Sequence, residues 1–86
     1  ASAALALAST AQAGDRIHVP LAGKTAEQIH ADILSAARTV CRRATASETL
    51  MLDAYSRCTS ATLKSALAEL ADPKVAELEE MRLAQR

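Results

Sequence analysis

The chain has 86 residues, half of them apolar, and its ten basic side chains balance ten acidic ones. A chain of this length forms one small domain, and a net charge of zero argues against binding nucleic acid or an anionic membrane through bulk charge. Tyr55 is the only aromatic residue of the Phe, Trp and Tyr class. Because aromatic side chains supply much of the burial in ordinary cores, we expect a thin Ala/Leu core that depends on a cross-link or on self-association.

The first 13 residues are uncharged, rich in Ala and Leu, and end in Ala11-Gln12-Ala13. Small residues in this arrangement after a short apolar run are typical of a signal-peptidase site. We therefore predict that residues 1–13 are a signal-peptide remnant and that residues 14–86 are a single small helical domain. The alternative is that residues 1–13 stay on the mature protein as an apolar arm, which would need a partner surface. The run is too short to span a bilayer.

Apolar and polar residues alternate from Ile17 to Leu21, which predicts a short strand with one buried face. Pro20 cannot donate a backbone hydrogen bond, so the strand lies at a sheet edge or ends there. The chain offers no obvious second strand. We therefore expect this segment to pack on the helices as an extended arm or to pair with another copy of the chain. A turn is expected at residues 22–24.

A first helix is predicted from Ala26 to Arg43. Thr25 and Gln28 have the spacing of a capping box, in which each side chain bonds the other residue's backbone N–H. Arginines near the C-terminal end suit the negative end of the helix dipole. Apolar residues recur at steps of three and four and form one stripe: Ala26, Ile29, Ile33, Ala36, Ala37 and Val40.

A second helix is predicted from Glu48 to Ala71, with Ser47 as its N-cap. Asp72 and Pro73 end it and begin a third helix, Pro73 to about Ala84, because Asp is a good N-cap and Pro suits the first helical position. The apolar face expected for the second helix consists of Leu50, Met51, Ala54, Cys58, Ala61, Leu67 and Leu70. In the third helix we expect Val75 and Leu78, with Met81 or Arg82, on the inner side, and Glu77, Glu79 and Glu80 facing water.

Cys41 and Cys58 are the only cysteines and enclose 16 residues. Each lies on or beside the apolar stripe of its predicted helix, so the two sulfurs can meet. In a chain this small, a pair of cysteines suits a disulfide formed in an oxidising compartment. The alternatives are two separate buried thiols or a redox-active pair, although the Cys-x-x-Cys spacing of redox motifs is missing. The fold predicted is therefore mainly α, with a short N-terminal β-like strand, a disulfide-stapled helical hairpin and a short third helix.

Candidate catalytic and ligand residues are few. His30 with Asp32 or Glu27 could be imagined as a metal site, but His18, the other histidine, lies on a different element, and no ligand spacing is recognisable. We expect both histidines to face solvent. We predict no catalytic residues, no cofactor and no metal.

Four arginines could form a basic patch near the cysteine loop: Arg38, Arg42, Arg43 and Arg57. The sequence has no Gly-rich loop and no aromatic stacker near them, so we expect no nucleic-acid site. Their predicted roles are to bond helix C-terminal carbonyls and to pair with Glu48 or Asp53.

Two short segments resemble a known family: Ala36-Ala37-Arg38-Thr39-Val40-Cys41 and Tyr55-Ser56-Arg57-Cys58. With the apparent secretion signal, the β-like stretch, the Ala-rich helix and the Pro-marked last segment, they make the chain similar to the UrcA family, small exported proteins of Gram-negative bacteria. The similarity covers nearly all of residues 17–78. It departs at residues 20–23, Pro-Leu-Ala-Gly, where many family members carry an acidic run. It implies export, a disulfide and this fold. The family has no established activity, so it implies no catalytic residues.

The sequence thus favours an exported, periplasmic or extracellular, non-enzymatic protein that acts through protein–protein contacts. The expected partner is the protein itself, as a homo-oligomer or assembly held by the N-terminal apolar arm or the strand. The alternative is a periplasmic stress-response module or one that binds a small ligand or a metal. Neither nucleic acid nor, after removal of the signal, a membrane is expected as a partner.

Overall fold

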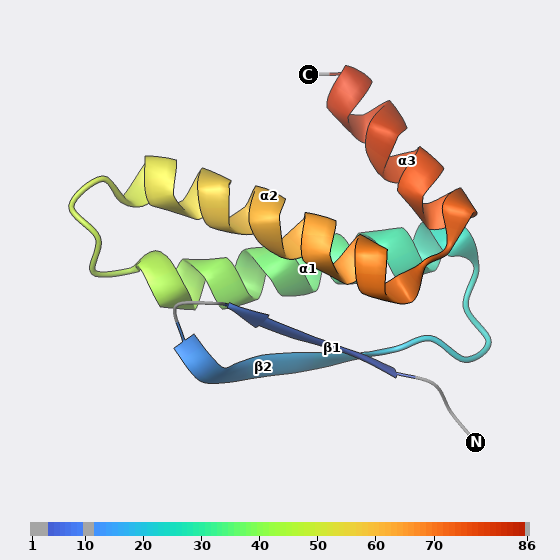
Figure 1. Cartoon of the computed structure of the whole chain (residues 1–86), viewed down its shortest axis with the longest axis horizontal. Helices are drawn as coiled ribbons and strands as arrows, with labels where there is room; N and C mark the ends of the chain where they lie inside the picture. Colours follow the sequence, from blue (N-terminus) through green and yellow to red (C-terminus); the bar gives the residue numbers. More distant parts are fainter. Residues whose placement is uncertain (1–3, 10–11, 86) are drawn as a thin grey trace.

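The computed structural model describes residues 4–9 and 12–85, which form a two-stranded sheet followed by three helices (Figure 1). The strands are β1 (Ala4–Ser9) and β2 (Gln12–Pro20), and the helices are α1 (Ala26–Thr45), α2 (Met51–Leu70) and α3 (Pro73–Ala84). The predicted fold class is confirmed. Part of the predicted signal remnant, residues 1–3 and 10–11, lies outside the described residues.

The strand predicted at residues 17–21 is the second half of β2, and it has a partner within the same chain. β1 pairs with it in antiparallel register, with Leu5 opposite Val19 and Leu7 opposite Ile17. The expectation that the chain offers no second strand was wrong, because residues 4–8 alternate Ala and Leu with a period of two, as a strand does. β2 ends at Pro20, as its missing N–H predicts.

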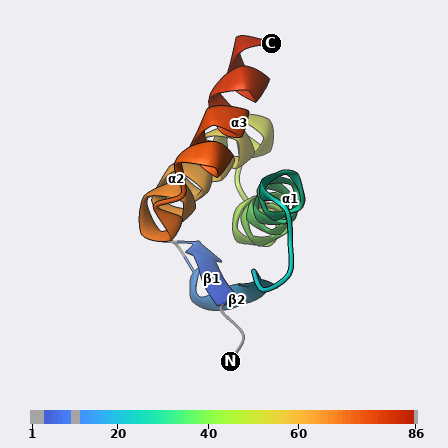
Figure 2. The ribbon, with the colours of Figure 1, turned by 90° about the vertical axis from the view of Figure 1, so that its right-hand side faces the viewer.

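Helices α1 and α2 lie side by side over the β-hairpin, and α1 contacts both strands, α2 and α3 (Figure 2). Its start is fixed by the predicted capping box: the Gln28 N–H donates to Thr25 Oγ1 at 3.1 Å, and the Thr25 N–H donates to Gln28 Oε1 at 2.9 Å. Its end lies two residues beyond Arg43, at Thr45. The buried side chains of α1 follow the predicted stripe: Ile29, Ile33, Ala36, Ala37, Val40 and Cys41, with Thr45 at the end.

Helix α2 begins at Met51, three residues later than predicted, and Ser47 is not its N-cap. The turn that closes α1 continues past Thr45, where the Glu48 N–H donates to the Thr45 carbonyl at 3.1 Å. Residues 46–50 are therefore needed to reverse the chain between two antiparallel helices. The predicted inner face of α2 is also shifted, because the buried residues are Thr62, Leu63 and Ala66.

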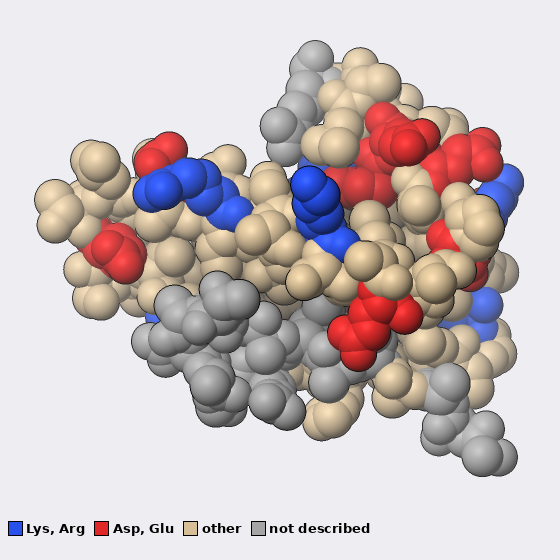
Figure 3. Space-filling view, viewed as in Figure 1, with Lys and Arg blue, Asp and Glu red and all other residues tan. Residues whose placement is uncertain are grey.

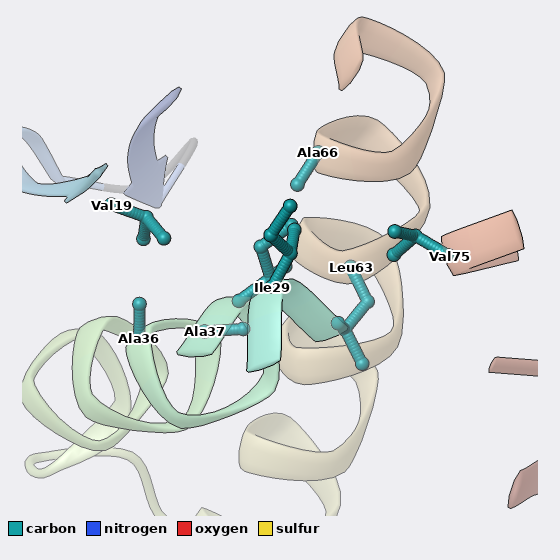
Figure 4. Packing of buried hydrophobic residues seen from close by; sticks show 8 residues of the cluster. Val19, Ile29, Ala36, Ala37, Leu63, Ala66 and Val75 are labelled. Carbon is teal, nitrogen blue, oxygen red and sulfur yellow. The ribbon is translucent and has the colours of Figure 1, made fainter. Parts of the chain in front are cut away.

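The core lies where β2, α2 and α3 converge on α1. Val19 points from β2 toward Ala36, while Leu63 and Val75 reach the same region from α2 and α3 (Figure 4). None of the largest fully buried side chains is aromatic: they are Ile33, Val40, Val75 and Cys41. Leu63 is the one leucine of the buried core cluster, so among the described residues the expected Ala/Leu core is built mainly from Ile, Val and Ala.

Helix α3 spans the predicted residues, and Asp72 Oδ1 accepts a hydrogen bond from the Lys74 N–H at 3.0 Å as the predicted N-cap. Between α2 and α3 the chain turns through Ala71, which adopts the left-handed conformation with φ 54°. Its N–H donates to the Leu67 carbonyl and ends α2. This position usually holds glycine, because a Cβ in the left-handed region is strained.

We predict that Ala71→Gly raises the free energy of unfolding by about 0.5–1 kcal/mol, since relief of the left-handed strain exceeds the added entropy of the unfolded chain. Ala68→Gly is the matched control: Ala68 is exposed within α2, and glycine there should lower stability by up to about 1 kcal/mol. Urea denaturation measures both. If Ala71→Gly lowered the free energy of unfolding as much as the control does, Ala71 would not be strained in its left-handed conformation.

Candidate functional site

The predicted disulfide is present and joins α1 to α2. The Cα atoms of Cys41 and Cys58 are 5.6 Å apart, and Cys41 is fully buried. The Thr62 hydroxyl lies 3.5 Å from the Cys41 sulfur and is itself buried. The alternative of two separate thiols is excluded. Cys41 lies near the end of α1 and Cys58 well inside α2, so the bond fixes a helical hairpin.

A buried ionic cluster joins α1 to α3. The Glu79 side chain, on a residue only 7% exposed, accepts two hydrogen bonds from Arg82: Nε to Oε1 at 2.9 Å and Nη2 to Oε2 at 2.8 Å. His30 Nε2, on α1, lies 2.8 Å from Glu79 Oε1. The expectations that Glu79 and His30 face solvent were wrong.

The inner face of α3 explains this correction. Val75, Glu79 and Arg82 follow one another at steps of four and three, so they share a helix face. This face lies against α1, so of the two alternatives expected on the inner side Arg82 is correct and Met81 is exposed. A buried carboxylate is tolerated there because Arg82 and His30 satisfy it.

The cluster changes the acid–base properties of its members. The two hydrogen bonds from Arg82 lower the pKa of Glu79 below its ordinary value, burial opposes them, and the bond to His30 lowers the pKa further. The same pairing raises the pKa of Arg82. Glu79 therefore remains ionised in the folded protein at neutral pH, and its negative charge is already compensated within the cluster.

His30, Asp32 and Glu27 do not form the metal site that was considered from the sequence. The Lys24 ammonium group pairs with the Asp32 carboxylate, and His30 pairs with Glu79. Within the described part of the chain, no group of three or more His, Cys, Asp or Glu side chains is arranged to hold a metal ion.

The arginines near the cysteine loop lie on both helices of the hairpin. Arg57 Nε pairs with Asp53 Oδ2 at 3.0 Å, as predicted, and both side chains are exposed. Arg42 and Arg43 occupy the last turn of α1. Arg38 lines a hollow of about 160 Å³ beside Tyr55 and Arg82.

Three consecutive apolar side chains are exposed where α2 begins, and we call them the hairpin tip: Leu50, Met51 and Leu52. Leu50 is 70% exposed and Leu52 80%. Leu50 and Met51 were expected on the inner face, but α2 begins too late for either to reach the core. Exposed large apolar side chains that are adjacent to one another are typical of an interaction surface.

A groove of about 460 Å³ lies between α2 and α3 at the other end of the hairpin. We call it the α2–α3 groove. It lies where α3, after its contact with α1, diverges from the helical pair (Figure 1). Its lining is mostly apolar, with charged groups at its sides: Ser60, Leu63, Lys64, Leu67, Ala76, Glu79, Glu80 and Leu83.

Comparison of the chain with models of known protein families, with curated proteins and with solved structures found no match. None of the described helices is long and apolar enough to cross a membrane. Three features were not predicted from the sequence: the hairpin tip, the α2–α3 groove and the role of Glu79. The one available signal was for the tip, because the apolar run Leu50-Met51-Leu52 stands beside a weak helix start.

We predict that Glu79→Gln lowers the free energy of unfolding by about 1–3 kcal/mol at pH 7, because it removes a buried charged hydrogen-bond acceptor. The folded-state pKa of Glu79 lies below its unfolded value of 4.5, so its contribution is present above that value and is lost as pH falls through the folded pKa. The variant and the wild type should therefore converge in acid.

Glu77→Gln is the matched control, since Glu77 lies exposed on the same helix. It should change stability by less than about 0.5 kcal/mol. Chemical denaturation between pH 3 and pH 7 measures all three proteins. A Glu79→Gln difference that stays constant down to pH 3 would contradict the role given to the ionised carboxylate.

Proposed function

We propose that the protein is exported to the periplasm or beyond the cell, is not an enzyme, and works through contacts with other protein chains, with itself as the first expected partner. The proposal includes membership of the UrcA family. The cysteines and the apolar N-terminal run support export. The surfaces that the fold leaves uncovered support the protein–protein contacts.

The buried disulfide supports the compartment. Structural disulfides form and persist in oxidising compartments and are rare in the cytosol. Cys41 is fully buried and Cys58 partly buried, so the bond lies inside the helical hairpin. Such a position suits a structural cross-link, because an exchanging disulfide needs access for an attacking thiolate.

The observation that carries the contact function is the open sheet. β1 and β2 form a sheet of only two strands, so within the described residues each strand has one unpaired edge. Unpaired edges present backbone N–H and carbonyl groups that can bond a strand from another chain. If a signal peptidase cleaves after Ala13, β1 is removed and β2 loses the strand that pairs with it. Both forms of the N-terminus thus favour strand-mediated association.

We predict that the oxidised chain self-associates as its concentration rises from about 10 μM to 1 mM, and that residues 14–86 do so at lower concentration than residues 1–86. The shorter chain has two open edges on β2, whereas in the longer chain β1 covers one of them. Sedimentation-equilibrium centrifugation of both chains measures this. Monomers of both chains at every concentration would contradict the proposed self-association.

A further inference from the structure

We propose that the hairpin tip of one copy docks in the α2–α3 groove of a second copy, so that copies associate head to tail. This inference rests on the proposed function and names a second contact surface, distinct from the strand edges. It follows from the apolar character of both surfaces, from their separation in one molecule and from their opposite charges.

The two surfaces are complementary in shape and polarity. The hairpin tip projects from the end of the helical pair with two leucines that are 70% and 80% exposed. The groove offers apolar walls from Leu67, Ala76 and Leu83 over the buried Leu63. Moving leucine side chains from water into such a groove is favourable, and nothing in the described part of this chain covers either surface.

A single copy cannot make this contact with itself. Both surfaces lie on α2, which is one continuous helix from Met51 to Leu70. At a rise of about 1.5 Å per residue, Leu52 lies roughly 16–22 Å along the axis from Leu63 and Leu67. The hairpin tip and the groove are also at opposite ends of the helical pair (Figure 1). A hairpin tip that occupies the groove must therefore belong to another copy of the chain.

The charges of the neutral chain are separated between the two ends. Residues 42–57, around the tip, contain three arginines against two acidic residues, Glu48 and Asp53. Residues 64–82, around the groove, contain five acidic residues against three basic ones. Acidic side chains gather over α3 in the space-filling view (Figure 3). Opposite charge at the two ends orients an approaching copy tip to groove and disfavours tip-to-tip contact.

The geometry also sets the kind of assembly. The tip and the groove are different surfaces, so the contact is heterologous and each added copy leaves one free tip and one free groove. Three apolar side chains and their charged surroundings make a small contact, which belongs with weak, transient interfaces. We expect association at concentrations of about 0.1–1 mM that weakens as salt rises from 0.05 to 0.5 M.

Complementary variants test this directly in the oxidised full chain. Leu50→Ser/Leu52→Ser removes the tip and keeps the groove. Leu83→Lys adds a positive charge to the groove and keeps the tip, and Glu80→Lys is a second groove variant on an exposed residue. Met81→Lys is the matched control for Leu83→Lys, because it makes the same charge change at a residue that is exposed on α3 and does not line the groove. Circular dichroism checks that each variant retains its helices.

Sedimentation should show that the tip variant and each groove variant weaken self-association at least about tenfold, whereas Met81→Lys has little effect. Mixing the tip variant with a groove variant should restore a one-to-one dimer that does not grow, because one intact tip meets one intact groove. If the wild type associates and the variants do not weaken that association, the tip-to-groove contact is overturned while strand-mediated association stands. A mixture that associates no more strongly than either variant alone also overturns the tip-to-groove contact. A wild-type monomer at every concentration overturns both.

Discussion

The covalent bond between Cys41 and Cys58 is the constraint on which the helical hairpin depends. Along the described length of α2, the buried residues begin at Thr62, so the first part of the helix brings no buried side chain to α1. The disulfide joins the helices at the boundary between this outer part and the core. In the loop-entropy model, a bond of this span contributes about 3 kcal/mol, a large share of the roughly 5 kcal/mol that a small domain retains. The bond allows the hairpin tip to project from the core with its leucines exposed.

A second constraint, the pairing of Glu79 with Arg82 and His30, shapes the other end of the molecule. It attaches the middle of α3 to α1, while the C-terminal end of α3 diverges from the helical pair beside the α2–α3 groove. The two constraints thus produce a projecting apolar surface at one end and an apolar groove at the other. Although the net charge of the chain is zero, a basic excess lies around the tip and an acidic excess lies around the groove.

The features that could be predicted from the sequence are those set by neighbouring residues. The Thr25–Gln28 box and the Asp72–Pro73 pair mark helix starts because capping bonds are local. The remaining features depend on distant partners. An alternating Ala/Leu run suits both a signal peptide and a strand, and only pairing with β2 distinguishes them. The burial of Glu79 depends on His30, 49 positions earlier, and no helical periodicity reveals such a partner. The start of α2 depends on the length of chain needed to reverse direction, which the Ser47 signal does not contain.

The most direct test of this account is urea denaturation of the oxidised chain and of the same chain reduced with a thiol. If the disulfide holds the outer hairpin to the core, reduction should lower the free energy of unfolding by about 3 kcal/mol, and the Cys41→Ser/Cys58→Ser chain should behave like the reduced protein. Equal stability of the oxidised and reduced chains, within about 0.5 kcal/mol, would contradict the central role given to this bond.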